Sequence, residues 1–331
     1  MIQYFKLIRI QNLLFVALIQ FLMSEVVIVP ILQVFGFDTG FDVSKLCLLI
    51  SSTVLIAAGG YVLNDYFDIK IDHINRPNKQ IVGLTVSRRT AMLLHQLLTG
   101  LGIILGLLLS FFAHSFTLAF IYIVVPGLLW FYSASYKRQF IIGNLVIAFV
   151  AGLAILIVGI AQLAFLQKEY GQLIFETPIP RQFYGWMGGF ALFSFLCTWL
   201  REIIKDMEDE KGDREMECRT MAILWGASKT KAFSYALIVL TISALYVFDL
   251  FLIPFQGTLT TRYIFWGLTL PFGALAYLMY AAKTPTDYHQ AATLAKFIMV
   301  IGVCYSFVFY YLQAKMFGIC LFNIFHPKIN G

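Results

Sequence analysis

Two short acidic segments carry the residue types that could do chemistry in this chain. The first, 64–77, reads NDYFDIKIDHINRP, and the second, 201–213, reads REIIKDMEDEKGD. Eleven of the 18 acidic residues lie within 65–72 and 202–217. Carboxylate oxygens at this density suit Mg²⁺, which proteins hold through a few carboxylates together with the phosphate oxygens of a substrate.

The spacing of the carboxylates would place them on one face of a helix in each segment. The two triplets, separated by three and then four residues, are Asp65, Asp68 and Asp72, and Asp206, Asp209 and Asp213. A helix brings such positions together. Like charges at i and i+4 destabilise a helix by a few tenths of a kcal/mol each, so a bound divalent cation is the simplest compensation. We expect the helix before the first motif to continue through Asp72 and to end at Arg76-Pro77.

Basic residues near these segments could complete a clamp for a diphosphate. The planar guanidinium group of Arg presents N–H donors that match phosphate geometry, whereas the ammonium group of Lys acts as a point charge. The candidate cations are Arg76, Lys79, Lys137, Arg138, Arg201 and Lys205. A Ca²⁺-binding EF loop is disfavoured, because the ligand spacing is wrong and no glutamate closes the loop. The alternative is a solvated charged loop that only caps helices.

The rest of the chain is apolar and supplies the elements that must position these side chains. Of 331 residues, 60% are hydrophobic and 13% are charged, and the mean hydropathy is +0.80. This composition excludes a soluble globule and a disordered chain, and five Cys are too few for a disulfide scaffold. We therefore predict an all-α polytopic membrane protein with one domain, 1–331. Apolar runs long enough to span a bilayer occur at 12–32, 46–63, 91–112, 116–134, 142–166, 184–202, 230–253, 262–282 and 293–314.

Most Lys and Arg residues lie in loops on one side of these predicted spans. The positive-inside rule places that side, the N-terminus and both acidic segments in the cytoplasm, and the C-terminus on the opposite side of an inner or plasma membrane. The net charge of +6 reflects this asymmetry, and we expect no nucleic-acid partner. Lys296 lies within the last run, where its long side chain allows it to snorkel.

The two acidic segments, which follow the second and sixth runs, resemble the aspartate-rich signatures of the UbiA-type intramembrane prenyltransferases. The stretch 132–137, YSASYK, followed by Gly143-Asn144, is similar to the tyrosine–lysine element of that family. The resemblance implies nine spans in a bundle around a central lipid-facing cavity. The separation of the acidic segments by four runs also predicts two pseudo-repeated four-helix halves.

The resemblance implies roles for particular residues. Mg²⁺, and through it the diphosphate of a polyprenyl donor, would be held by Asn64, Asp68, Asp72, Asp209 and Asp213. The catalytic candidates are Asp65, Asp72, Asp206 and Tyr132. Asn12 is expected to face the site, as polar residues early in the first helix of this family often do, and to help bind the diphosphate.

The lipophilic acceptor is left open between two classes. The segments 75–77 and 201–206, together with Arg9, look more like the ether-lipid branch, the digeranylgeranylglyceryl phosphate synthases, in which the hydroxyl of a prenylglyceryl phosphate attacks a geranylgeranyl donor. The sequence departs from that branch at 78–83, which lacks a second Arg-Pro pair. The runner-up is prenylation of an aromatic ring in quinone or chlorophyll-type biosynthesis. A cation-coupled transporter is disfavoured, because the acids lie at a membrane face and not at the midplane.

Overall fold

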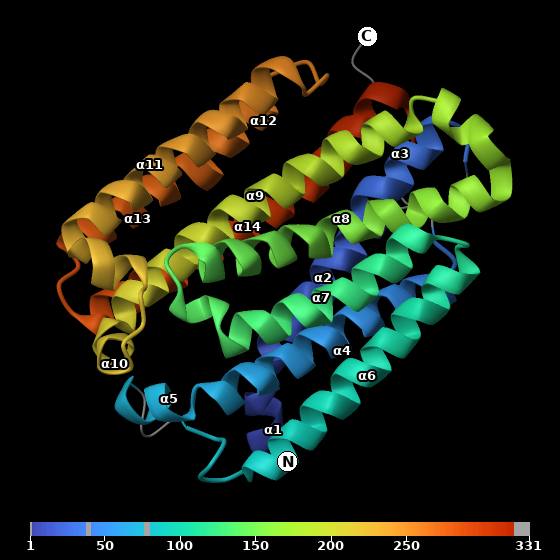
Figure 1. Ribbon diagram of the computed structural model, residues 1–331. Coiled ribbons are helices and arrows are strands. Elements are labelled where there is room, and N and C mark those ends of the chain that lie inside the picture. The colour runs from blue at the N-terminus through green and yellow to red at the C-terminus, as the bar shows by residue number, and fades with distance from the viewer. Residues whose placement is uncertain (1, 38–40, 76–79, 321–331) are drawn as a thin grey trace.

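The computed structural model describes residues 2–37, 41–75 and 80–320, and helices account for nearly all of them (Figure 1). In this part of the chain, nine helical segments are long and apolar enough to cross a membrane, and they overlap the nine predicted runs, which confirms the all-α, nine-span prediction. The spans are Ile10–Val34, Val43–Phe67, Arg88–Phe112, Phe116–Ala134, Ile142–Glu176, Ile179–Glu208, Met221–Phe251, Leu259–Ala281 and Pro285–Phe317. The two pseudo-repeated halves stay a prediction.

The N-terminal part of the chain forms one side of the bundle. Helix α4 packs against α6, and α7 contacts both of them and α8. The elements are α1 (Ile2–Leu7), α2 (Ile10–Leu22), the π-helix η1 (Met23–Ile28), α3 (Val29–Val34), α4 (Val43–Phe67), α5 (Ile69–Asn75), α6 (Arg88–Phe112), α7 (Phe116–Ala134), the 3₁₀ turn η3 (Tyr136–Arg138) and α8 (Ile142–Tyr170). Arg9 joins α1 to α2 in a left-handed conformation, φ 53° and ψ 55°.

The C-terminal part is organised around α9, which packs against α8, α11 and α14 (Figure 1). The elements are the 3₁₀ helix η4 (Gly171–Glu176), α9 (Ile179–Glu208), α10 (Glu210–Glu215), α11 (Met221–Phe251), α12 (Leu259–Tyr263), the π-helix η5 (Ile264–Thr269), α13 (Leu270–Ala281) and α14 (Pro285–Phe317). Buried residues of α9 contribute to two apolar clusters, one with α2, α3 and α8 and the other with α11 and α13, while α14 contributes to both. The end of α9 is therefore fixed relative to both sides of the bundle.

Both acidic motifs lie at the same end of the bundle, where α5 and α10 are neighbours (Figure 1). The expected continuous helix through the first motif is wrong, because α4 ends at Phe67 and Asp68 adopts φ −88° and ψ 2° before α5 begins. The second motif breaks in the same way at Asp209, with φ −94° and ψ 5°. Each motif is thus a helix, a break at an aspartate and a short helix. Aspartate favours such breaks because its short side chain competes with helical backbone bonding.

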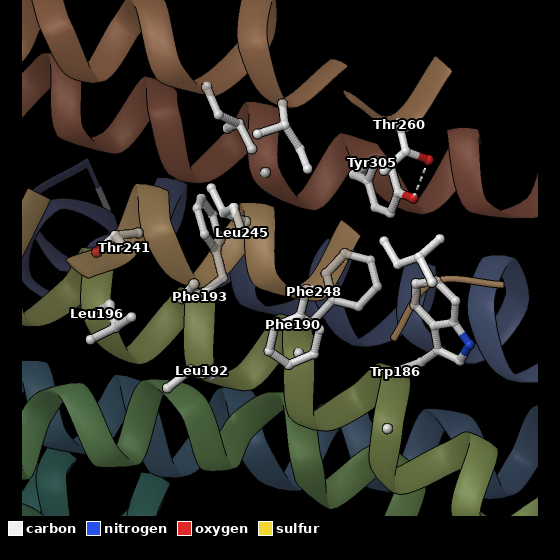
Figure 2. A pocket seen from close by; sticks show the side chains of 17 residues that line it. Trp186, Phe190, Leu192, Phe193, Leu196, Thr241, Leu245, Phe248, Thr260 and Tyr305 are labelled. Atoms are coloured by element: carbon white, nitrogen blue, oxygen red, sulfur yellow. Dashed lines mark hydrogen bonds between the residues drawn. The ribbon is translucent and has the colours of Figure 1, made fainter. Parts of the chain in front are cut away.

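A small apolar pocket lies between α9, α11 and α14 (Figure 2). Its volume is about 90 Å³, and aromatic side chains such as Phe190, Phe193 and Phe248 form much of its wall. Its polar contact is the hydroxyl pair of Thr260 and Tyr305, 3.0 Å apart. None of the lining residues is Asp, Glu, Lys or Arg, so this pocket offers no charged group for chemistry.

Candidate active site

The first motif presents an amide and a carboxylate to a lysine from another segment. Nδ2 of Asn64 donates to Oδ2 of Asp68 at 2.7 Å. Nζ of Lys137 donates to Oδ1 of Asn64 at 3.4 Å and forms an ion pair with Asp68. Both side chains of this ion pair are largely buried. The tyrosine–lysine element therefore meets the first motif directly.

The second motif brings buried carboxylates to the same place. Nδ2 of Asn144, at the start of α8, donates to Oδ2 of Asp206 at 2.9 Å. Asp213, in α10, is 9% exposed. Burial and the nearby carboxylates of Asp209 and Asp68 raise the pKa of Asp213 to about 7. Carboxylates of the two motifs are therefore close enough to repel one another.

Asn75 fastens the two motifs together. Its Nδ2 donates to the carbonyl of Asp209 at 3.2 Å, and its Oδ1 accepts from the backbone N–H of Gly212 at 2.9 Å. A Cβ added at Gly212 would lie 2.5 to 2.6 Å from the Asn75 side chain. Glycine at this position therefore permits the close approach of α5 and α10.

A second close approach fixes the lysine. A Cβ added at Gly143 would lie 2.6 Å from Cα of Lys137, so glycine lets α8 begin against the 3₁₀ turn η3. The carbonyl of Arg138 accepts from the N–H of Arg219 at 2.8 Å, which ties the turn to the segment after α10. The turn therefore contacts the first motif through Lys137 and the segment that follows the second motif through Arg138.

A cavity of about 570 Å³ opens from this region into the bundle between α2, α4, α7, α8, α9 and α14. Asn64 and Tyr132 line it near the motifs, and apolar side chains such as Ile19, Ile155 and Ile157 line its deeper part. This geometry agrees with the predicted central cavity, because one end is polar and the rest would accommodate a hydrocarbon chain.

A group of side chains, all charged except Asn12, lines the same cavity, and we call it the cavity cluster: Arg9, Asn12, Arg201, Glu202, Lys205 and Lys296. Arg201 pairs with Oε1 of Glu202 at 2.6 Å, and Nζ of Lys205 lies 3.9 Å from Oε2. Nζ of Lys296 donates to Oδ1 of Asn12 at 3.3 Å. Nη2 of Arg9 donates to Oδ1 of Asp65 at 2.8 Å.

The structure divides the predicted site residues into two groups. We call the group at the motifs the motif rim: Asn64, Asp68, Lys137, Asp206, Asp209 and Asp213. The predicted residues in or beside the cavity are Asn12, Asp65, Tyr132, Arg201 and Lys205. The N–H of Asp72, in α5, donates to the carbonyl of Asp68 at 2.8 Å. Arg76 and Lys79 lie outside the described residues.

Sequence reasoning missed several residues that position this site. Asn75 and Asn144 both lie inside the motif segments. The sequence does not indicate their hydrogen-bond partners, because these depend on how the helices pack. Glu202 was counted only as part of an acidic run. Lys296 carried a clearer signal, because an ionisable residue inside a membrane span is a functional candidate by default.

Comparisons with known proteins agree with this geometry. The UbiA prenyltransferase family model matches residues 27–301. A digeranylgeranylglyceryl phosphate synthase of Sulfurisphaera tokodaii is 33% identical over 243 residues, which cover 72% of this chain and 75% of the relative. A solved structure of a digeranylgeranylglyceryl phosphate synthase superposes with a TM-score of 0.63 at 24% identity and covers 93% of this chain and 97% of that chain.

A second solved structure is a UbiA homologue from Archaeoglobus fulgidus bound to DMAPP and Mg²⁺. It superposes with a TM-score of 0.54 at 16% identity and covers 94% of this chain and 99% of that chain. The superpositions establish the shared fold, and the sequence matches establish the family. The chain therefore belongs to the UbiA prenyltransferase family and is an integral membrane prenyltransferase.

Proposed function

We propose that this enzyme transfers a geranylgeranyl group from its diphosphate to the hydroxyl of a geranylgeranylglyceryl phosphate in a Mg²⁺-dependent reaction that forms an ether lipid. The observation that carries the proposal is the grouping of Asp68, Asp213 and Lys137 next to Asn64, which lines a largely apolar cavity. The name of the Sulfurisphaera tokodaii relative supports the glyceryl acceptor.

The residues of the motif rim fit a divalent cation that also binds the donor diphosphate. Among the described residues, no three His, Cys, Asp or Glu side chains already form a metal cage. The donors are oxygens from four residues of the rim, Asn64, Asp68, Asp209 and Asp213, and from Asp72 in α5. Oxygen is the ligand type that Mg²⁺ prefers when substrate phosphates and water complete its shell. Burial and the nearby carboxylates of Asp209 and Asp68 raise the pKa of Asp213, and a bound cation would relieve the repulsion between these carboxylates. When bound, Mg²⁺ would stabilise the negative charge that develops on the leaving diphosphate.

Side chains of the protein would stabilise the remaining charges and exclude water. Lys137 holds a positive charge beside Asp68, and so would stabilise the same leaving group. Asp206, bound by Asn144, would position the second motif. Tyr132 lines the cavity, where its ring could stabilise an allylic cation. The apolar cavity would exclude the water that otherwise captures this cation.

The membrane orientation is part of the proposal. Nine spans in the described residues support termini on opposite sides of the membrane. The positive-inside rule favours a cytoplasmic N-terminus and a cytoplasmic motif rim, where a soluble diphosphate donor would be available. Cysteine labelling from either side of sealed vesicles tests this orientation.

The test of the function is a transfer assay with purified protein, Mg²⁺ and radiolabelled geranylgeranyl diphosphate. The acceptors are geranylgeranylglyceryl phosphate, 4-hydroxybenzoate and 1,4-dihydroxy-2-naphthoate, offered separately. We expect label in the glyceryl ether and loss of that product with Asp68→Ala. Label in an aromatic product alone would replace the proposed acceptor with the aromatic class. No product with any acceptor would overturn the proposed function.

A further inference from the structure

The cavity cluster lies deeper in the bundle than the motif rim. Arg201 precedes Asp209 by eight residues, which corresponds to ~12 Å along a helix axis. Lys296 approaches the same part of the cavity from α14, an element that contributes no residue to the rim. Lys205 lies between the two groups, since it is near Glu202 and its charge also acts on Asp213.

The charges of the cavity cluster do not balance. Four cations, Arg9, Arg201, Lys205 and Lys296, line this part of the cavity. Asp65 pairs with Arg9, and Glu202 is shared by Arg201 and Lys205. Asp206 of the motif rim also acts on Lys205, so three carboxylates offset the four cations. Lys296 donates to the neutral amide oxygen of Asn12. The cluster therefore has an excess of positive charge next to an apolar chamber, where uncompensated charge is costly.

Two polar atoms at this place also lack partners within the described structure. Nε of Arg201 and the hydroxyl of Thr198 are buried and form no hydrogen bond. Both residues line the cavity, one helical turn apart on α9. Buried donors are normally satisfied, so the residues of the cluster leave part of their own hydrogen-bonding capacity unused.

We propose that Arg201 and Lys296, with Lys205 at the edge, bind the phosphate monoester of the acceptor, a subsite distinct from the one that binds the donor diphosphate. This inference rests on the proposed prenyl transfer to a glyceryl phosphate. A phosphate monoester carries a charge of about −1.5 to −2 at neutral pH, which is opposite in sign to the excess positive charge of the cluster.

The depth of the cluster suits this ligand. The attacking hydroxyl must come within ~3–3.5 Å of the allylic carbon, and the glyceryl backbone that joins this hydroxyl to its phosphate is short. The acceptor phosphate must therefore lie near the donor diphosphate without sharing its ligands. The cavity cluster meets this condition, because it adjoins the motif rim along α9 but draws Lys296 and Asn12 from other helices. Lys296 would then select acceptors that carry a phosphate.

The experiment compares two acceptors that differ only in the phosphate: geranylgeranylglyceryl phosphate and geranylgeranylglycerol. Wild type and Lys296→Met are assayed with both acceptors at saturating donor, and the donor KM is measured separately. We expect Lys296→Met to raise the KM for the phosphate acceptor roughly tenfold or more, the order expected for losing a charge-assisted hydrogen bond. The KM for the alcohol and for the donor should change less than about twofold, and Lys296→Arg should restore most of the preference for phosphate.

A matched control is Lys315→Met, which removes the same charge from the last turn of the same helix and should leave all three KM values unchanged. An equal loss with both acceptors would show that Lys296 is structural and would overturn the subsite. A rise in the donor KM instead would assign the cluster to the diphosphate, which also overturns it.

Binding separates this proposal from the proposed function. The affinity of catalytically inactive Asp68→Ala protein for geranylgeranylglyceryl phosphate is measured by calorimetry in detergent, with and without the Lys296→Met change. A tenfold weakening that the alcohol does not show supports the subsite even if the assay finds no ether product. Equal affinities for the phosphate and the alcohol in Asp68→Ala protein would overturn the subsite even if prenyl transfer is confirmed.

Discussion

The two acidic motifs break their helices in the same way but stabilise their carboxylates differently. In each, a long span ends just before an aspartate with nearly the same backbone angles, and a short helix follows. In the first motif, Asp68 pairs with the charged Lys137. In the second, Asp206 receives a hydrogen bond from the neutral Asn144, and Asp213 is buried near other carboxylates.

This difference indicates which part of the site depends on a ligand. A lysine at hydrogen-bond distance stabilises a carboxylate within the protein itself, whereas burial among like charges destabilises one. The first motif is therefore largely pre-organised, and the second has more to gain from a bound cation. Four changes test whether the two motifs differ in this dependence on a bound cation.

Removal of the divalent cation should have the largest effect. We expect a chelator to abolish prenyl transfer and re-added Mg²⁺ to restore it, because the leaving diphosphate needs charge neutralisation. Hydrogen exchange gives the sharper readout: Mg²⁺ with a non-reactive diphosphate should slow exchange in α10 more than in α5. Slower exchange in α5 alone would reverse the comparison, and full activity in chelator would remove the metal from the proposal.

Asp68→Ala is expected to lower kcat/KM by about 10³-fold, because it deletes a carboxylate of the rim and leaves Lys137 without its ion-pair partner. Steady-state kinetics measure this loss, and the thermal midpoint of the purified protein checks folding. Glu215→Ala, an exposed acid of α10, is the matched control and should cost less than about twofold. Comparable losses in the two variants would mean that the total negative charge at this end of the bundle matters and not the position of Asp68.

Lys137→Met should lower kcat/KM by about 10²-fold, the usual cost of removing one charge-stabilising donor. Because Lys137 and Asp68 act as a pair, the double variant with Asp68→Ala should be little worse than Asp68→Ala alone. Double-mutant kinetics measure this coupling. Fully additive losses would show that the ion pair between Lys137 and Asp68 does not contribute to catalysis.

Gly212→Ala should give the smallest loss, about tenfold, which is typical when a group that orients metal ligands is disturbed. The added methyl would press on Asn75 and separate the motifs without removing a charge. Adding Asn75→Ala relieves the contact but loses the two hydrogen bonds, so it should recover little activity. Gly100→Ala, where an added Cβ meets nothing within 4 Å, is the control. Full recovery in the double variant would show that Asn75 does not fasten the motifs.

Much of this architecture could be predicted from the amino-acid sequence. Nine apolar runs predicted nine spans, because a bilayer imposes a length and a polarity on every crossing segment. The two acidic triplets and the tyrosine–lysine element identified the rim, since charges in such a chain are costly and few. The break at Asp68 was not predicted, because spacing alone favours a continuous helix and the competing side-chain bonds of an aspartate depend on local packing.

The sequence by itself determined that this chain crosses a membrane nine times and carries carboxylates at one face of it, because both properties depend on residue types close together in the chain. Only the tertiary structure decided which cations serve which carboxylates. Lys137 reaches Asp68 across 69 residues, and Asn12 meets Lys296 across 284. The packing of α2, α9 and α14 separates the cations predicted as one clamp into a motif rim and a deeper cavity cluster, and no local pattern encodes which helices become neighbours.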